Sequence, residues 1–462
     1  APPLEEIKTF LPLVFPAEQR RRVHSWLDTV RPGPVQVEEA GVKMEILIDV
    51  ETVPAPRTAV AELSHAEIER LSRAWEAWDS FLVYEIEALI GQPVTDAERG
   101  VLLEVLLENR HGFFEALEGR TVNQDIVRHQ FVWTWQRMAH ILRKHLVDRR
   151  SPSPLGYLAF FTAADALVAL DRLGPSLGLE ISRDGLIRLA RLLSADLSDP
   201  TLSYSYALDP GLRTFLGFGQ PLDDSGPTLE DQELEIPAAP EGNPVSNDLR
   251  SRLNRLLFPR AWASTPNMLD QIRQWIPSAR NRTHYLTKVR QLLDDAAGRV
   301  LDAEPLGGGG NDFFRLLLLS TAWQESCWRQ FIVRNGKIRY LISYNRSSVG
   351  LMQINERVWR GIYRVESLRW NIGYNVRAGT EILNLYLRTF SLKEISPATP
   401  ADFDRIAQVT YAMYNGGPGQ LKKFFERKSA NALYRSDRLF LEKYRAAKAG
   451  RLDRVALCLI DP

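Results

Sequence analysis

The segment LLSTAWQESCWRQF, residues 318–331, decides how the C-terminal part of the chain is interpreted. Its apolar residues recur at three- and four-residue spacing, which predicts an amphipathic helix. The segment contains one acid, Glu325, among Ala322, Trp323, Cys327 and Trp328. Because apolar neighbours remove water from a carboxylate, three alternatives arise: Glu325 is a solvated surface residue, a buried structural acid or a proton donor.

The residues around this helix outline a small domain. Four glycines at 307–310 predict a flexible loop after a helix at 282–301, and Asn311 and Asp312 are good N-caps for the next helix. Downstream, Asn335-Gly336 between β-branched and aromatic residues predicts a hairpin. The stretches GLMQIN (350–355) and VTYAMYNGGPG (409–419) then supply an amide side chain and a tyrosine-rich helix end.

This order of elements predicts a cleft with a single carboxyl group. Burial near Trp323 should raise the pKa of Glu325 and keep it protonated near neutrality, as a general acid for glycosidic bonds requires. Most glycosidases use a second carboxylate. The segment 330–348 contains no Asp or Glu, and Glu356, Glu366 and Glu381 fall in helix-like segments. A site with one carboxylate needs a nucleophile that the substrate itself supplies.

Three ordered motifs resemble those of the family 1 lytic transglycosylases of the soluble-lytic-transglycosylase (SLT) type. They are Gln324-Glu325-Ser326, Gly350-Leu351-Met352-Gln353 and Tyr414-Asn415-Gly416-Gly417. The resemblance covers roughly residues 283–462. It implies a lysozyme-like, mostly helical α+β fold that cleaves peptidoglycan glycan strands between N-acetylmuramic acid and N-acetylglucosamine. It also implies a periplasmic location and no cofactor.

The resemblance also implies roles for single residues. Glu325 acts first as acid and then as base, closing a 1,6-anhydro ring without water. Tyr414, followed by Asn415 of the same motif, hydrogen-bonds Glu325, and Gln353 contacts the sugar or the acid. Met352 lines the groove and Ser326 fixes the catalytic helix. Four aromatic residues are candidates for stacking on sugars, although each alone is more typical of a core: Tyr344, Trp359, Trp370 and Tyr374.

Two departures from the family pattern concern the site. The link between the first two motifs is longer than usual, with Ser347 and Ser348 where the family has Gly and Ala. The late ETxxYV motif is reduced to EKYRAAK, with Glu442 in the acid position and Lys443 in place of Thr. Glu442 is therefore a candidate for substrate binding, with a plain surface acid as the alternative.

Cysteine and histidine usage indicates no metal site. The chain has two cysteines, and its seven histidines form no HExxH motif. His140 and His145 are interpreted as surface or packing residues. In a periplasmic protein, Cys327 and Cys458 are a candidate disulfide between the catalytic helix and the tail, with two buried thiols as the alternative.

The first 222 residues predict a second, mainly helical domain of unrecognised type. Helical periodicity covers 64–90, 96–117, 123–146 and 154–173, whereas 41–53 is β-rich and predicts one short strand or hairpin. Residues 223–248 are rich in Pro, Gly and acids and predict a linker. The C-terminal region, 249–462, then begins with a helix near 247–258.

The charge distribution and the hydropathy of the chain limit the classes of binding partner. Residues 311–462 carry 25 Lys and Arg against 13 Asp and Glu, while the rest of the chain is net acidic. This asymmetry suits a polyanion, or a protein partner for the acidic N-terminal domain, or mere complementarity within the chain. No recognised module supports nucleic-acid binding. No apolar run reaches the roughly 18 residues of a membrane span, so a soluble protein is expected.

The sequence leaves alternatives for the origin of the chain start and for the function. The start, APPLEEIKTF, lacks signal-peptide features and fits either a mature terminus or an arbitrary start; without a nearby cysteine, no lipid anchor is expected there. Two other functions compete with a lytic transglycosylase: a muramidase-like hydrolase on the same fold and a non-catalytic peptidoglycan-binding assembly protein.

Overall fold

The computed structural model describes residues 65–118, 126–146, 154–173, 183–193, 202–224, 234–235, 271–334, 336–344 and 346–459, together with Arg21. The chain divides into two compact units, residues 1–204 and residues 205–462. Both are mainly helical, which confirms the fold class in its coarse form. The segments predicted at 41–53 and 247–258, and most of the predicted linker, lie outside the described residues.

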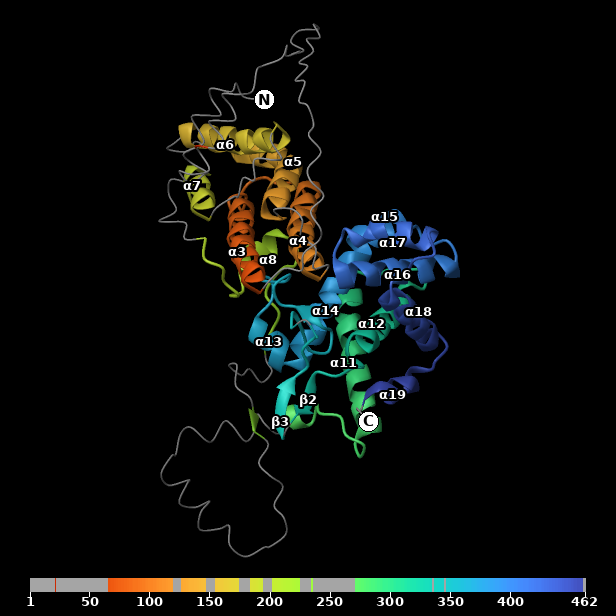
Figure 1. Cartoon of the computed structure of the whole chain (residues 1–462). Helices are drawn as coiled ribbons and strands as arrows, with labels where there is room; N and C mark the ends of the chain where they lie inside the picture. The colour runs from red at the N-terminus through yellow and green to blue at the C-terminus, as the bar shows by residue number, and fades with distance from the viewer. Residues whose placement is uncertain are drawn as a thin grey trace, which may run out of the picture. The chain divides into compact units, whose positions relative to one another are not determined.

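The first unit contains helices α3 (His65–Glu87), α4 (Asp96–Glu118), α5 (Ile126–Leu146), α6 (Pro154–Leu173) and α7 (Arg183–Leu193) (Figure 1). The first four match the helices predicted from periodicity to within a few residues. Helix α3 packs against α4, α5 and α7. Aromatic side chains fill the space between them; Trp75 stacks on Phe113 with ring centroids 4.4 Å apart.

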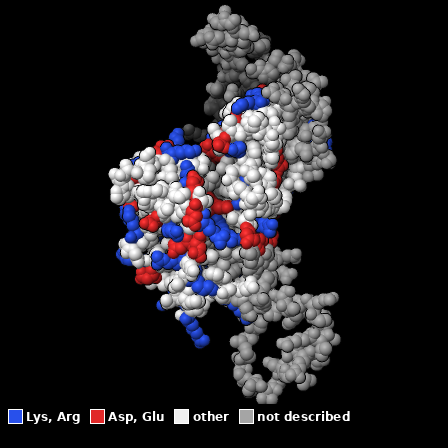
Figure 2. All heavy atoms as spheres, turned by 180° about the vertical axis from the view of Figure 1, so that it is seen from behind, with Lys and Arg blue, Asp and Glu red and all other residues white. Residues whose placement is uncertain are grey.

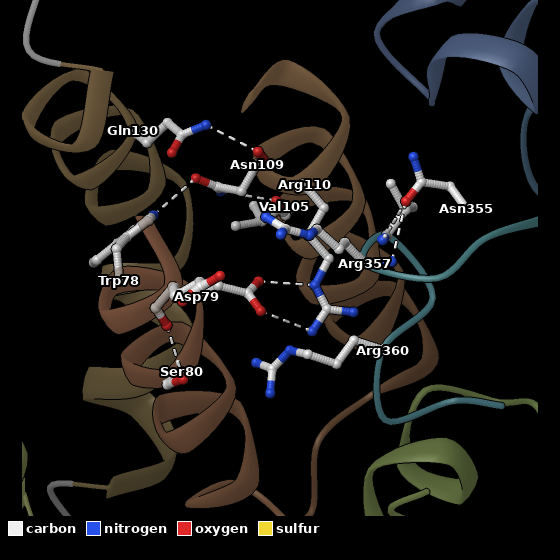
Figure 3. A network of polar contacts seen from close by, with 12 residues as sticks. Trp78, Asp79, Ser80, Val105, Asn109, Arg110, Gln130, Asn355, Arg357 and Arg360 are labelled. Carbon is white, nitrogen blue, oxygen red and sulfur yellow. Dashed lines mark hydrogen bonds and ion pairs between the residues drawn. The ribbon is translucent and has the colours of Figure 1, made fainter. Parts of the chain in front are cut away.

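Polar contacts cross the core of this unit. Arg110 on α4 forms a two-point ion pair with Asp79 on α3, with its Nε 2.8 Å from Oδ1, and both side chains are buried (Figure 3). Beside them, Trp78 Nε1 donates to Asn109 Oδ1 at 3.1 Å, and Gln130 on α5 donates to the Asn109 carbonyl. These side chains therefore each bond to a residue on another helix, which helps specify how the three helices align.

Two histidines of α5, His140 and His145, have the surface and packing positions predicted for them. His140 is exposed on α5. His145 is buried, and its Nε2 lies 3.0 Å from Glu98 Oε2 on α4. The described residues hold no group of three or more His, Cys, Asp or Glu side chains placed to bind a metal ion. None of the described helices has the length and apolar character needed to cross a membrane.

The second unit surrounds α12 (Gly310–Ser326) with further helices (Figure 1). They are α8 (Pro210–Phe215), α11 (Arg282–Ala303), α13 (Val365–Trp370), α14 (Ile372–Tyr386), the π-helix η2 (Leu387–Ser391), α15 (Leu392–Glu394), α16 (Pro400–Gly416), α17 (Gln420–Ser429), α18 (Arg435–Lys448), η3 (Leu452–Val455) and α19 (Ala456–Leu459). Helices α11, α16 and α18 pack directly on α12. Its residues Phe314, Leu317, Leu318 and Ala322 are fully buried as a result.

Two small sheets accompany these helices. Strands β2 (Phe331–Arg334) and β3 (Lys337–Tyr340) form the hairpin predicted from Asn335-Gly336, and β1 (Leu234–Glu235) pairs with the other edge of β3. Strands β4 (Ser348–Val349) and β5 (Ile354–Asn355) form a second pair around the GLMQ turn. The hairpin prediction is therefore confirmed.

The boundary between the units differs from the prediction. Residues 205–222, predicted to belong to the N-terminal domain, pack with the second unit. Arg213 on α8 is buried there and donates to both carboxylate oxygens of Glu381 on α14, at 2.9 and 3.0 Å. Asp224 accepts a 2.6 Å hydrogen bond from Ser367 Oγ. A buried guanidinium paired with a residue 168 positions away is not visible in sequence periodicity.

The start of α12 also differs from the prediction. Asn311 and Asp312 are not N-caps, because the helix already begins at Gly310 and its N-cap is Gly309, with φ 81°. Asn311 Oδ1 instead accepts from the backbone N–H of Leu306 at 2.9 Å and closes the loop. The glycines 307–309 all have positive φ, so the loop takes a backbone path that glycine permits.

Candidate active site

Glu325 is the next-to-last residue of α12 and is half-buried. The helix ends directly after it because Cys327 and Trp328 adopt left-handed conformations, with φ 53° and 61°. Trp328 is fully buried, and its indole Nε1 donates to the Leu319 carbonyl at 3.0 Å. The acid therefore lies at a rigid helix end, with part of its side chain still accessible.

Burial raises the pKa of Glu325 from its ordinary value of 4.5 to about 7. A carboxylate in a poorly hydrated site loses solvation, so the protonated form becomes relatively more stable. Two neighbours act in the opposite direction: a hydrogen bond from Tyr411 and the positive charge of Lys443 both lower this pKa. The result is a carboxyl that can both donate and accept a proton near neutral pH.

The tyrosine that holds Glu325 is Tyr411, so the prediction for Tyr414 is wrong. Tyr411 Oη donates to Glu325 Oε1 at 2.9 Å, whereas Tyr414 Oη donates to the Met352 carbonyl at 2.6 Å. Both residues lie on α16, one helical turn apart. Burial and the charge of Glu325 raise the pKa of Tyr411 well above 10, so its hydroxyl stays a donor.

Helix α18 supports Tyr411 from behind. The ring of Phe440 stacks on the Tyr411 ring with centroids 4.2 Å apart and planes parallel to within 1°. One turn further along α18, Lys443 Nζ donates to the Trp323 carbonyl at 3.3 Å, in the last turn of α12. Both contacts arise because α12, α16 and α18 meet at this point (Figure 1).

The GLMQ turn is held against the end of α12 by buried polar side chains. Ser326 Oγ donates to the Leu351 carbonyl at 2.6 Å, which agrees with the helix-fixing role predicted for Ser326. Gln330 Oε1 accepts from Leu351 N at 2.7 Å, and Asn375 Oδ1 on α14 accepts from Met352 N at 2.8 Å. Each interaction satisfies a backbone group of the turn, so the turn and the acid are positioned together.

This network predicts a strong effect of Gly350→Ala. Gly350 has φ 77°, and a Cβ built on it would lie 2.2 Å from Asn375 Nδ2 and 2.6 Å from Gln330 Oε1. Strain and displaced amides should together lower the free energy of unfolding of the second unit by about 3 kcal/mol or more. Chemical denaturation measures this loss.

Gly450→Ala is the matched control for Gly350→Ala. Gly450 has φ 73°, but a Cβ there would meet no atom within 4 Å. Only backbone strain remains, so the expected loss is about 1 kcal/mol. Equal losses in the two variants would contradict the role given to the amide network.

Met352 and Gln353 do not have the surroundings that were predicted. Met352 is fully buried against Gly379 of α14 and does not line a groove, so that prediction is wrong. Gln353, with φ 47°, turns its Nε2 back onto the Gly350 carbonyl at 2.7 Å. Among the described contacts, its side chain closes the turn, and a contact with sugar stays a prediction.

The remaining predicted site residues divide by exposure. Tyr344 is fully exposed, and Asn415 and Glu442 are exposed on α16 and α18. Trp359, Trp370 and Tyr374 are at most 4% exposed, so they are core residues and not platforms for sugars. Tyr374 Oη also accepts from Arg364 N at 3.0 Å.

Two of the other glutamates considered in the sequence form ion pairs, and the third is exposed. Glu356 pairs with Arg369, whose Nη2 lies 2.9 Å from Oε2, and Glu381 pairs with Arg213. Glu366 is exposed in the first turn of α13. Among the described residues, the charge that shifts the pKa of Glu325 is that of Lys443 and no second carboxylate contributes.

The two cysteines form a disulfide, which confirms the predicted pairing of Cys327 with Cys458. The bond joins the residue after α12 to α19, with Cα atoms 5.9 Å apart. It therefore ties the end of the helix that carries Glu325 to the C-terminal segment.

A pocket of about 380 Å³ lies at the other end of α12. The loop 306–310, Phe313 and Phe403 contribute to its mostly apolar lining. A 17-residue helix spans about 25 Å, so this pocket is not part of the candidate site.

Four side chains that build the candidate site were not identified as site residues from the sequence: Tyr411, Gln330, Asn375 and Lys443. Tyr411 could have been recognised from the sequence, because it shares a helix face with Tyr414. No sequence pattern marks Gln330 and Asn375, because their partners are backbone groups of a turn distant in the sequence. Comparison with family models, with curated proteins and with solved structures finds no match for this chain.

Proposed function

We propose that the second unit is a lysozyme-like catalytic domain and that the protein is a lytic transglycosylase of peptidoglycan. One observation carries the proposal: a single half-buried carboxyl, Glu325, has a pKa of about 7 and a tyrosine hydroxyl on one oxygen. The order of acid-bearing helix, hairpin, GLMQ turn and tyrosine-rich helix supports the family resemblance.

In the first step, Glu325 donates its proton to the oxygen between N-acetylmuramic acid and N-acetylglucosamine. The bond from the anomeric carbon to this oxygen breaks, and the muramyl N-acetyl oxygen attacks the anomeric carbon. Tyr411 remains bonded to the carboxylate that forms and stabilises its charge. A pKa near 7 leaves a substantial protonated fraction at neutral pH.

In the second step, the carboxylate of Glu325 takes the proton of the muramyl C6 hydroxyl. The C6 oxygen then bonds to the anomeric carbon, which releases the N-acetyl oxygen and closes a 1,6-anhydro ring. Because this nucleophile belongs to the substrate, its effective concentration at the reacting carbon is high. The mechanism therefore needs one carboxylate, in agreement with the surroundings of Glu325.

The same features favour an extracytoplasmic location such as the periplasm. Disulfides persist in oxidising compartments, and Cys327 is joined to Cys458. On the face shown in Figure 2, acidic and basic side chains intermingle, so this face presents no extended patch of one charge. For the acidic first unit, a role in binding a protein partner stays a prediction.

Digestion of purified peptidoglycan tests the proposal. Mass spectrometry of the soluble products should show muropeptides with 1,6-anhydro ends, each one water lighter than the hydrolysis product. Reducing ends alone would identify a muramidase-like hydrolase. Binding to sacculi without soluble product would identify a non-catalytic binding protein.

Tyr411→Phe tests the hydrogen bond to the acid. The variant removes one donor to the Glu325 carboxylate, so the pKa of Glu325 should rise. Because the carboxylate that forms in the first step is then less stabilised, turnover near neutral pH should fall about tenfold. The measurement is the rate of release of anhydro-muropeptides as a function of pH.

Tyr414→Phe is the matched control on the same helix. Its hydroxyl is bonded to the Met352 carbonyl, so its loss should lower the stability of the GLMQ turn and leave the pH profile in place. A shifted profile in Tyr414→Phe and an unshifted one in Tyr411→Phe would reverse the assignment of the two tyrosines.

A further inference from the structure

Lys443 places a positive charge against the last turn of α12, the turn that carries Glu325. It is half-buried on α18, and its Nζ donates to the Trp323 carbonyl, two residues before Glu325. Its Nζ also lies 5.8 Å from the centroid of the Trp323 ring. Burying part of a lysine costs solvation, and this burial lowers the pKa of Lys443. A cation retained at such a cost is a candidate for function.

The position of Glu325 explains why a cation is useful there. The C-terminal end of a helix has partial negative charge from carbonyl groups without helical N–H partners. Glu325 is in the last turn of α12, so this field and burial both disfavour its ionised form. Lys443 donates to the Trp323 carbonyl, which also accepts from the backbone N–H of Cys327 at 3.1 Å, and so brings positive charge to the same turn.

Resting on the proposed function, we propose that Lys443 is a positioning residue of the active site: its ammonium group, anchored on the last turn of α12, stabilises the carboxylate form of Glu325. In the first step this makes Glu325 a stronger acid, because the charge that appears on proton transfer is partly balanced. Burial keeps the group protonated beforehand, and Lys443 prevents the pKa from rising beyond the useful range.

Other charged and titratable groups also surround the acid, and of the cations among them Lys443 is the one that lowers the pKa of Glu325. From α16, the site receives the neutral hydroxyls of Tyr411 and Tyr414. From α11, Tyr285 Oη donates to the Trp328 carbonyl. On α18, Glu442 is exposed beside Lys443, and Asp437 pairs with Arg427 at 3.5 Å. Beyond the helix end, Arg329 Nε donates to the Ser326 carbonyl.

The test compares Lys443→Met with Lys448→Met. Lys448 is on the same helix, but its Nζ pairs with Asp404 at 2.8 Å on the surface. In Lys443→Met the pKa of Glu325 should rise by about half a unit or more. The alkaline limb of kcat should move up by the same amount, with KM unchanged and the plateau rate severalfold lower. Lys448→Met should leave all these values in place.

A direct titration keeps the result independent of catalysis. Protein labelled with ¹³C at the glutamate carboxyl carbons gives one resonance that is absent from the Glu325→Gln spectrum, and its shift against pH reports the pKa of Glu325. Lys443→Arg should restore the wild-type pKa, since it restores the charge. An unchanged pKa in Lys443→Met, or a raised pKa in Lys443→Arg, would overturn the proposal.

Failure of this inference and failure of the proposed function have different signatures. If the wild-type protein releases no anhydro-muropeptides, the proposed function fails, while the carboxyl titration still decides the role of Lys443. If activity is present and Lys443→Met lowers it equally at every pH with an unshifted titration, Lys443 only supports the helix contact.

Discussion

Glu325→Gln is expected to reduce the release of anhydro-muropeptides by about a thousandfold or more, because the same group donates the proton in the first step and accepts it in the second. Glutamine keeps the size and the hydrogen-bonding oxygen that accepts from Tyr411, so the site should keep its shape. The measurement is the initial rate on purified peptidoglycan under identical conditions for both proteins.

Glu442→Gln is the control for this loss. Glu442 is an exposed acid on α18, in the position of the late family motif, and it lies next to Lys443 without being part of the site geometry described for Glu325. It should retain most of the wild-type rate. Full activity in Glu325→Gln would remove the assignment of the catalytic acid, whatever Glu442→Gln showed.

The stability of Glu325→Gln separates lost chemistry from lost folding. The folded-state pKa of Glu325, about 7, is above its ordinary value of 4.5, so the folded protein holds this proton more tightly. Its contribution to stability is therefore complete below pH 4.5 and is lost as pH rises through 7. Because glutamine does not ionise, Glu325→Gln does not lose stability in this way as pH rises. Above neutral pH the variant should be more stable than wild type, by at most about 3 kcal/mol, and near pH 4 the two should be alike.

Helices and the hairpin could be predicted because their signals are local. Apolar residues at helical spacing mark the buried stripe of α3, α4 and α5, and Asn335-Gly336 fits the two-residue turn between β2 and β3. The place of helix α8 in the second unit could not be predicted from a local signal. Its attachment to the second unit depends on the buried pair of Arg213 and Glu381, which only the folded chain brings together.

The candidate acid was predictable and its partners were not. An acid between tryptophans in an apolar helix is unusual in any sequence, so Glu325 was identified directly. Tyr411 and Tyr414 are three residues apart and project from nearly the same face of α16. Which of them reaches Glu325 depends on how α16 packs on α12, and Phe440 stacked behind Tyr411 helps determine that packing.

Removing the disulfide should have the largest effect on stability. Cys327→Ser with Cys458→Ser opens a bond that joins residues 131 positions apart, and chain entropy then favours the unfolded second unit by about 5 kcal/mol. For a unit of this size the midpoint of thermal unfolding should fall by about 10 °C. The bond also tethers α19, whose Leu459 is buried, so the tail should lose protection from proteolysis.

Reductant and the first unit provide the controls for this prediction. A strong thiol reductant should lower the wild-type midpoint to that of the double variant and leave the double variant unchanged. The unfolding of the first unit should not move, since both cysteines belong to the second. Because Cys327 follows Glu325 by two residues, the rate on peptidoglycan should also fall at temperatures where the variant is folded. An unchanged rate would show that the packing of α12 against α16 and α18 alone holds the acid in place.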